Sequence, residues 1–284
     1  MHREQGFLQY LLARGKLDIA SAKQVLAAYP HTVPDLALRA YASGLIHEAA
    51  DSSLKGLIDV EFIAVCEEIG CMPESVAQNF VEFIPQPGLR MAETIAATGI
   101  LSRSTVAEAY QAYVKTEESF LRQAMKALSD EELEQEIFLY TEYMNVFLRS
   151  MEDFLEFPAV VLPRTEVEDV KKEFSQMVAQ TIEGAKCMET AIAGADGVFY
   201  ALASAYAHED IGENEELATD SMKEFLNVVN GNYAVLLDQR DIDVDLSLPR
   251  FGRKIKILPS RLLEVPLATP AGSCLVILAT DRFL

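Results

Sequence analysis

One amphipathic stretch near the C-terminal end of the chain constrains the fold most. Between about residues 214 and 238, apolar side chains recur at intervals of three and four, which is the period of an α-helix with one buried face. The residues of this apolar stripe are Met222, Phe225, Leu226, Val229 and Tyr233. We therefore expect a long helix whose apolar face packs against a core.

Two polar residues lie on the neighbouring face of this predicted helix. Glu224 and Asn227 are three positions apart, so they are adjacent on the helix surface and can act on one molecule together. Gly231 follows in the helix interior, where it costs about 1 kcal/mol relative to Ala. We interpret it as a point of close approach by another backbone or by a partner. The alternative is that Glu224 and Asn227 are solvated polar residues without a function.

The full pattern is longer than the Glu-x-x-Asn pair and much less common. It consists of Glu224, Asn227, Gly231 and Asn232 on the helix, followed by a strand from Val244 to Pro249 that ends in Leu-Pro. This pattern resembles the CheX/CheC-type phosphatases of bacterial chemotaxis, and the resemblance covers about residues 130–284. It implies an α+β domain with an antiparallel sheet, long helices and a pseudo-twofold duplication. It also implies an activity, the removal of phosphate from the aspartyl phosphate of a CheY-like response-regulator receiver domain.

The resemblance assigns roles to individual residues. An acyl phosphate already has a good leaving group, so a water held in line with the P–O bond accelerates its hydrolysis. The resemblance implies that Asn227 holds this water by accepting one of its hydrogens. Glu224 would anchor the complex by pairing with the Lys beside the phosphoaspartate. The implied partner-binding residues are Gly231, Asn232 and Lys223. Mg²⁺ is expected on the receiver's own carboxylates, so no cofactor or metal site is expected in this chain.

A second Glu-x-x-Asn-Val sequence lies earlier in the chain, at Glu142 and Asn145. It also leads to a segment that ends in Leu-Pro, and we interpret the two copies as the halves of the duplication. Arg149 and Ser150 stand in the first copy where the second has Gly-Asn. Glu142 and Asn145 are therefore a possible second site, and the alternative is that the first copy is inactive.

The N-terminal part of the chain, up to about Ala127, is predicted to form an all-helical domain. Four segments share an apolar helix, a glycine and then a second helix, as expected for stacked helical hairpins. The glycines are Gly15, Gly44, Gly70 and Gly99, and the spacing from the first to the second equals that from the third to the fourth. We expect a helical-hairpin repeat domain with a docking or regulatory role, and a purely structural or oligomerising role is the alternative.

A capping box, Ser129-Asp130-Glu131-Glu132, predicts the start of a long helix that ends near Phe154. It sets the predicted domain boundary, with domains at residues 1–127 and 128–284. Other elements are predicted from turn residues and periodicity. They are an extended piece at Pro158–Pro163, a strand pair within Ser175–Gly194, a helix at Asp196–His208, strands at Val244–Leu248 and Ile255–Leu258, and a final hairpin that turns at Thr269–Gly272.

Charge and composition exclude several classes of function. The formal net charge is −20, and a surface this negative repels nucleic acid and anionic membranes. Half of the residues are hydrophobic, which excludes a disordered chain. No signal-peptide core and no run of about 20 apolar residues is present, so we expect a cytoplasmic protein. The four cysteines are scattered and are expected to be reduced, and the four histidines share no zinc-ligand spacing.

Two charged clusters have competing interpretations. Asp241, Asp243 and Asp245 alternate as in a calcium loop, but the glycine and glutamate that such a loop needs are absent, which favours a half-buried strand. A basic cluster follows the Leu-Pro strand. It is either an ordinary turn-and-strand surface or a landing patch for the acidic pocket of a receiver domain. Its members are Arg250, Arg253, Lys254, Lys256 and Arg261.

Three functions are compatible with the sequence. A phosphatase predicts that Glu224 and Asn227 are exposed on one helix face and unpaired within the monomer. A non-catalytic adaptor that binds signalling partners predicts that this face is covered. A small-molecule sensor would need an apolar pocket. The outer strands of the sheet also make a homodimer possible, because unpaired strand edges can bind a second subunit.

Overall fold

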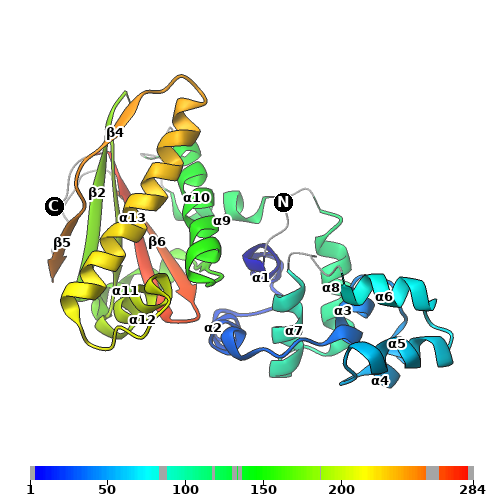
Figure 1. Cartoon of the computed structure of the whole chain (residues 1–284). Coiled ribbons are helices and arrows are strands. Elements are labelled where there is room, and N and C mark those ends of the chain that lie inside the picture. The colour runs from blue at the N-terminus through cyan, green and yellow to red at the C-terminus, as the bar shows by residue number, and fades with distance from the viewer. Residues whose placement is uncertain are drawn as a thin grey trace. The chain divides into compact units, whose positions relative to one another are not determined.

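The computed structural model describes residues 4–82, 88–116, 119–129, 133, 136–185, 187–253 and 262–280. It divides into two compact units, Met1–Phe120 and Leu121–Leu284 (Figure 1). The division lies at the start of helix α9 (Phe120–Leu128), whereas the sequence places the boundary after residue 127. The reason is packing, because Met125 and Leu128 are buried in the core of the C-terminal unit.

The described part of the N-terminal unit is helical, as predicted. Gly15, Gly44, Gly70 and Gly99 adopt φ values of 62°, 75°, 64° and 70°, so each ends a helix in the left-handed conformation that favours glycine. The elements are α1 (Glu4–Ala13), α2 (Ile19–Ala28), η1 (Tyr29–His31), α3 (Leu36–Ala42), α4 (Glu48–Leu54), α5 (Asp59–Glu68), α6 (Glu74–Glu82), α7 (Leu89–Thr98) and α8 (Arg103–Tyr113).

The four predicted hairpins form, but they do not stack in chain order. Helix α7 of the fourth hairpin contacts α1 and α2 of the first hairpin and α3 of the second. The fourth hairpin therefore lies between the first two, and only the third extends the array, through contacts of α5 with α3 and α4. Sequence spacing predicts the hairpins, whereas their order depends on long-range contacts.

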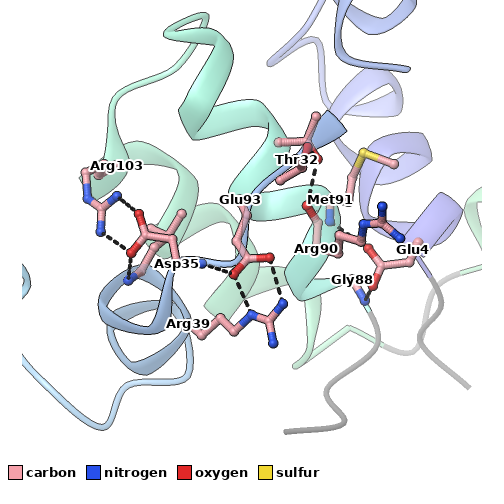
Figure 2. A network of polar contacts seen from close by, with 11 residues as sticks. Glu4, Thr32, Asp35, Arg39, Gly88, Arg90, Met91, Glu93 and Arg103 are labelled. Carbon is pink, nitrogen blue, oxygen red and sulfur yellow. Dashed lines mark hydrogen bonds and ion pairs between the residues drawn. The ribbon is translucent and has the colours of Figure 1, made fainter. Parts of the chain in front are cut away.

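A buried charge network fixes the fourth hairpin against the second (Figure 2). The Glu93 carboxylate is buried and accepts hydrogen bonds from the Arg39 guanidinium and from the Asp35 backbone N–H, the latter at 2.7 Å. Arg103 forms ion pairs with both Asp35 and Asp51. Burial raises the pKa of the Asp35 carboxyl, but its hydrogen bonds, with Arg103 foremost, outweigh burial and leave the pKa below its ordinary value.

The N-terminus of α7 is capped by a side chain from the start of α1, which lies far from it in sequence. The Glu4 carboxylate accepts hydrogen bonds from the backbone N–H groups of Gly88 at 3.0 Å and Met91 at 2.6 Å (Figure 2). A carboxylate at this position satisfies free N–H groups and complements the helix dipole. Helix α1 is thereby tied to α7.

The C-terminal unit is an α+β domain, as predicted. Its described helices are α10 (Ile137–Leu155), η3 (Arg164–Glu166), α11 (Val167–Glu173), α12 (Asp196–Ala207) and α13 (Glu215–Asp238). Its described strands are β1 (Val160–Val161), β2 (Gln176–Gly184), β3 (Met188–Gly194), β4 (Val244–Leu246), β5 (Arg250–Arg253), β6 (Leu262–Thr269) and β7 (Gly272–Ala279). The predicted strand at Ile255–Leu258 lies outside the described residues.

One helix start differs from the prediction. Helix α10 begins at Ile137, not at Ser129, whose hydroxyl donates to the backbone carbonyl of Lys126 at the end of α9. The other members of the predicted capping box, residues 130–132, lie outside the described residues.

The described strands form one antiparallel sheet in the order β1-β6-β7-β3-β2-β4, with β5 paired to β2 beside β4. Helices α10, α12 and α13 cover one face, where α10 and α13 lie side by side (Figure 1). Helix α11 covers the other face. The apolar stripe of α13 is buried in the first of these layers, as predicted.

The strand order itself shows the pseudo-twofold duplication. The first half contributes α10, β1 and the β2–β3 hairpin, and the second contributes α13, β4 with β5, and the β6–β7 hairpin. Strand β1 pairs with the hairpin of the second half, and β4 and β5 pair with the hairpin of the first. Exchanging the two halves gives the same arrangement read from the opposite edge of the sheet. The edge strands are short, which limits edge-to-edge pairing, and the homodimer remains a prediction.

Among the described residues, no helix is long and apolar enough to cross a membrane.

Candidate functional site

Glu224 and Asn227 lie on one face of α13, beside its buried stripe. The Glu224 side chain is exposed and has no hydrogen bond or ion pair with any described residue. Tyr206 of α12 lies close enough to respond to the Glu224 charge. Burial raises the pKa of Tyr206, and the negative charge of Glu224 raises it further. Glu224 therefore carries an uncompensated charge at the surface of the sheet-covering layer.

Asn227 is half-buried, and it is not unpaired as the phosphatase interpretation expects. Its Oδ1 accepts a hydrogen bond of 2.8 Å from Nε2 of Gln180, which lies beneath it on β2. Its Nδ2 group has no hydrogen-bond partner within the described part of the chain. The amide is thus held from below on one side and open on the other.

A buried polar network extends from Gln180 into the core. Nε2 of Gln180 also donates to the Ser247 carbonyl at 2.7 Å, and its Oε1 accepts from Nδ2 of Asn230 at 2.8 Å. Oδ1 of Asn230 accepts from the Tyr143 hydroxyl at 2.8 Å, and Nδ2 of Asn230 also donates to the Thr190 hydroxyl at 2.9 Å. Gln180, Asn230, Thr190 and Tyr143 are fully buried, so these hydrogen bonds are shielded from water.

The Leu-Pro strand end has a structural role beside this network. Strand β2 pairs with β4 at one end and β5 at the other, and the segment between them interrupts the ladder opposite Gln180 and Thr181. Ser247 bridges the interruption, because its N–H donates to the Thr181 carbonyl and its hydroxyl accepts from the Thr181 N–H, both at 3.0 Å. Leu248, the next residue, is 86% exposed, which places a large apolar side chain on this surface.

The three implied partner-binding residues surround the pair along α13. A Cβ atom on Gly231 would meet nothing within 4 Å, so no part of the described chain approaches this glycine. The helix leaves open space there, and the backbone approach predicted from the sequence does not come from within this chain's described residues. Asn232 is exposed, and the half-buried Lys223 lies 3.7 Å from the Asp220 carboxylate.

The first Glu-x-x-Asn copy is engaged within the molecule. Glu142 of α10 forms two hydrogen bonds, of 2.5 and 2.6 Å, with the guanidinium of Arg240, which follows the C-terminal end of α13. Nδ2 of Asn145 donates to the backbone carbonyl of Thr141 in its own helix at 3.0 Å. Arg149 forms an ion pair with Asp153 where the second copy has its glycine. Asn145 is itself exposed, so the two copies differ in the partners of their polar groups and not in exposure alone.

The described part of the basic cluster is neutralised within the chain. Arg250 pairs with the buried Glu189, which also accepts a hydrogen bond from the Thr181 hydroxyl. Arg253 pairs with Glu215 at 2.8 Å. These two arginines therefore do not form a free landing patch. The other members of the cluster, Lys254, Lys256 and Arg261, lie outside the described residues.

Within the described ranges, no group of three or more His, Cys, Asp or Glu side chains could hold a metal ion. The strand interpretation of the alternating acids holds for Asp245, which lies in β4 between partly buried residues, whereas Asp241 lies in a turn with a φ of 59°. The four cysteines are free. Burial raises the pKa of the Cys274 thiol to about 12, so this thiol is unreactive.

Gln180, Thr190 and Asn230 were not predicted from the sequence as part of the site. A signal for them exists, because each is a polar residue at a position that should face the core. Gln180 lies between Val178 and Ile182 on the buried face of β2, and the other two occupy similar positions on β3 and α13. Burying an amide or a hydroxyl without a partner costs several kcal/mol, so polar residues at core positions predict that they bond to one another.

No protein-family model matches the chain, and no curated protein sequence matches it significantly. Solved structures with a similar fold include the chemotaxis protein CheX from Desulfovibrio desulfuricans, at 13% identity over 49% of this chain and 96% of that chain, with a TM-score of 0.40. CheX from Vibrio vulnificus shares 16% identity over 48% of this chain and 95% of that chain, with a TM-score of 0.41. The CheX–CheY–BeF3–Mg²⁺ complex from Borrelia burgdorferi matches at 18% identity over 48% of this chain and 94% of that chain, with a TM-score of 0.40. These matches each cover about half of this chain and leave its N-terminal part unassigned.

Proposed function

We propose that the C-terminal unit hydrolyses the aspartyl phosphate of a CheY-like receiver domain, with Glu224 and Asn227 as its working pair. In this reaction the oxygen of a water forms a bond to phosphorus and the bond between phosphorus and the aspartyl oxygen breaks. The products are a free aspartate and inorganic phosphate, and the proton of the water passes to the phosphate or to solvent. No covalent intermediate on this chain is required.

The observation that carries the proposal is the contrast between the two side chains of the pair. Glu224 is exposed and has no ion-pair partner among the described residues, so it is available to a cation on another protein. Asn227 is already held by Gln180 at 2.8 Å before any partner arrives. A side chain held in this way loses little entropy when it positions a water or a phosphoryl group, which lowers the barrier of the reaction.

The surface around the pair fits an incoming protein better than a small molecule. Gly231 leaves open space beside the helix one turn after Asn227, and Leu248, the residue after Ser247, offers an exposed apolar side chain. A receiver domain places its phosphoaspartate beside a lysine, which is a suitable partner for Glu224. The Mg²⁺ that screens the phosphate belongs to the receiver's own carboxylates under this proposal. The choice of a receiver domain as partner rests on the residue pattern that resembles the CheX/CheC-type phosphatases.

The test is the decay of a phosphorylated receiver domain from the same cell, measured alone and with the full-length protein. We expect the wild-type protein to accelerate the decay, and Asn227→Ala to lose most of this acceleration while it still binds the receiver. A matched control is Asn145→Ala, which changes the same residue type in the first copy and leaves the acceleration unchanged. A receiver that binds but decays at its own rate would rule out the phosphatase and leave the non-catalytic adaptor.

A further inference from the structure

The orientation of the Asn227 amide follows from the network beneath it. An amide oxygen and nitrogen are distinguished by their partners. The Ser247 backbone carbonyl can only accept, so the Gln180 atom that contacts it at 2.7 Å is the donor Nε2. The same Nε2 contacts Asn227 at 2.8 Å, which identifies the contacting atom of Asn227 as the acceptor Oδ1.

The orientation of Asn230 follows from that of Gln180. Oε1 of Gln180 can only accept, so the Asn230 atom that contacts it at 2.8 Å is the donor Nδ2. Oδ1 of Asn230 then accepts from the Tyr143 hydroxyl at 2.8 Å. The Gln180 amide is therefore fixed by the Ser247 carbonyl on one side and by Asn230 on the other, and Asn230 is itself bonded to Tyr143 of α10.

We propose that Gln180 is a positioning residue that locks the Asn227 amide with its NH2 group outward, so that Asn227 meets the phosphorylated partner as a hydrogen-bond donor. The inference deepens the proposed function and rests on it. The expectation from the resemblance was that Asn227 accepts a water hydrogen. Oδ1 retains one lone pair for a water, but Nδ2 is the group without a partner among the described residues, and it can donate to a phosphoryl oxygen while charge develops there.

The lock also explains why polar residues occupy core positions of β2, β3 and α13. Apolar residues at Gln180, Thr190 and Asn230 would continue the surrounding core without the cost of burying amides. Their presence is explained if they hold the Asn227 amide in its orientation.

The kinetic test compares Gln180→Met with Val178→Ala in the full-length protein. Gln180→Met keeps the length of the side chain and removes its hydrogen bonds, so the Asn227 amide rotates freely. We expect the catalytic rate constant for receiver dephosphorylation to fall by about 10- to 100-fold and KM to stay within about twofold, since docking by Glu224 is intact. Val178→Ala removes core packing on the same face of the same strand, and it controls for lost stability.

A second, independent readout follows the side-chain amide protons by NMR in the free protein. We expect the Nε2 protons of Gln180 to be protected from solvent exchange and the Nδ2 protons of Asn227 to exchange rapidly. Gln180→Glu places an acceptor beneath Asn227, so the amide turns over and its Nδ2 protons become protected. A merely structural role of Gln180 does not produce this exchange of protection.

The outcomes separate the inference from the proposed function. If Gln180→Met is as active as Val178→Ala while Asn227→Ala is inactive, the positioning role is wrong and the phosphatase stands. If Asn227→Ala is fully active, the phosphatase proposal fails. If the Nδ2 protons of Asn227 are protected in the wild-type protein, the outward orientation is wrong whatever the kinetics show.

Discussion

The two Glu-x-x-Asn copies differ in what holds their polar groups, although they share sequence and occupy equivalent places in the fold. In the first copy, Glu142 is paired with Arg240 and Asn145 is bonded to its own helix. In the second copy, Glu224 is free of ion pairs with described residues and Asn227 is held by the core. The glutamate of the first copy is thus paired within the chain, whereas that of the second copy has no ion-pair partner among the described residues.

The buried positions next to the two copies also differ in polarity. When the two Glu-x-x-Asn sequences are aligned, Leu148 is the counterpart of Asn230, and Phe225 is the counterpart of Tyr143. The first helix therefore contributes the Tyr143 hydroxyl to the network under the second site, whereas the second helix has the apolar Phe225 at the matching position. A residue of the first half thus helps to hold the buried network beneath the polar pair of the second half.

The sharpest test of this asymmetry is to remove each glutamate in turn. We expect Glu224→Ala to weaken binding of the phosphorylated receiver by about 2–5 kcal/mol, because it leaves a buried cation of the partner unpaired in the complex. Glu142→Ala removes only the partly exposed ion pair with Arg240 of the same chain, and it is expected to leave receiver binding unchanged. Binding is measured by titration calorimetry with a receiver trapped in its phosphorylated form. Equal losses in both variants would show that the first copy is a working second site.

The next test makes the second helix resemble the first at its buried position. We expect Asn230→Leu to lower the free energy of unfolding by about 1–3 kcal/mol, because the Tyr143 hydroxyl and Oε1 of Gln180 lose their partners in the core. Leu148→Met preserves volume and is expected to cost less than about 1.5 kcal/mol. Urea denaturation of both variants measures the difference. A neutral Asn230→Leu would mean that the network contributes nothing to stability.

The sequence was sufficient for the elements whose signal is local. The stripe of α13, the hairpin glycines of the N-terminal unit and the β6–β7 turn all follow from periodicity or from backbone preference at single positions. The duplication was also visible, because both copies retain Glu-x-x-Asn-Val. The start of α10 was misplaced because Ser129 closes α9, and a serine near a helix boundary can cap either side.

The contacts that hold the site residues in place could not be predicted from local sequence patterns. Gln180 and Asn227 are far apart in sequence, and their contact depends on the register between α13 and β2. The pairing of Glu142 with Arg240 spans even more of the chain and is decided by where α13 ends. Local patterns identify which residues carry a site, whereas long-range packing decides whether they are free to act.

Gly231 and its counterpart Arg149 allow stability and partner binding to be separated. We expect Gly231→Ala to raise the free energy of unfolding by about 1 kcal/mol, because alanine favours the helix and its Cβ meets nothing within 4 Å. The same change is expected to weaken receiver binding, because the partner loses its close approach to the helix. Arg149→Ala removes an exposed i,i+4 pair and is expected to change neither property appreciably. Thermal unfolding and calorimetry on the same samples provide both values. A more stable Gly231→Ala that binds normally would remove this glycine from the interface.

The smallest expected effect is a change in tyrosine pKa, and it tests whether Glu224 lies beside Tyr206 and Glu142 beside Tyr233. Burial is the main cause of the raised pKa of Tyr206, and the Glu224 charge adds to it. Burial likewise raises the pKa of Tyr233, and there the added charge is that of Glu142. A negative charge disfavours the phenolate, so neutralising it must lower the pKa of the adjacent tyrosine while burial keeps that pKa above its ordinary value. We expect Glu224→Gln to lower the pKa of Tyr206 alone and Glu142→Gln to lower that of Tyr233 alone, as followed by NMR titration of the labelled tyrosine rings. If Glu224→Gln leaves Tyr206 unchanged, its carboxylate does not lie at the α12–α13 surface, and the open site assigned to the second copy loses its anchor.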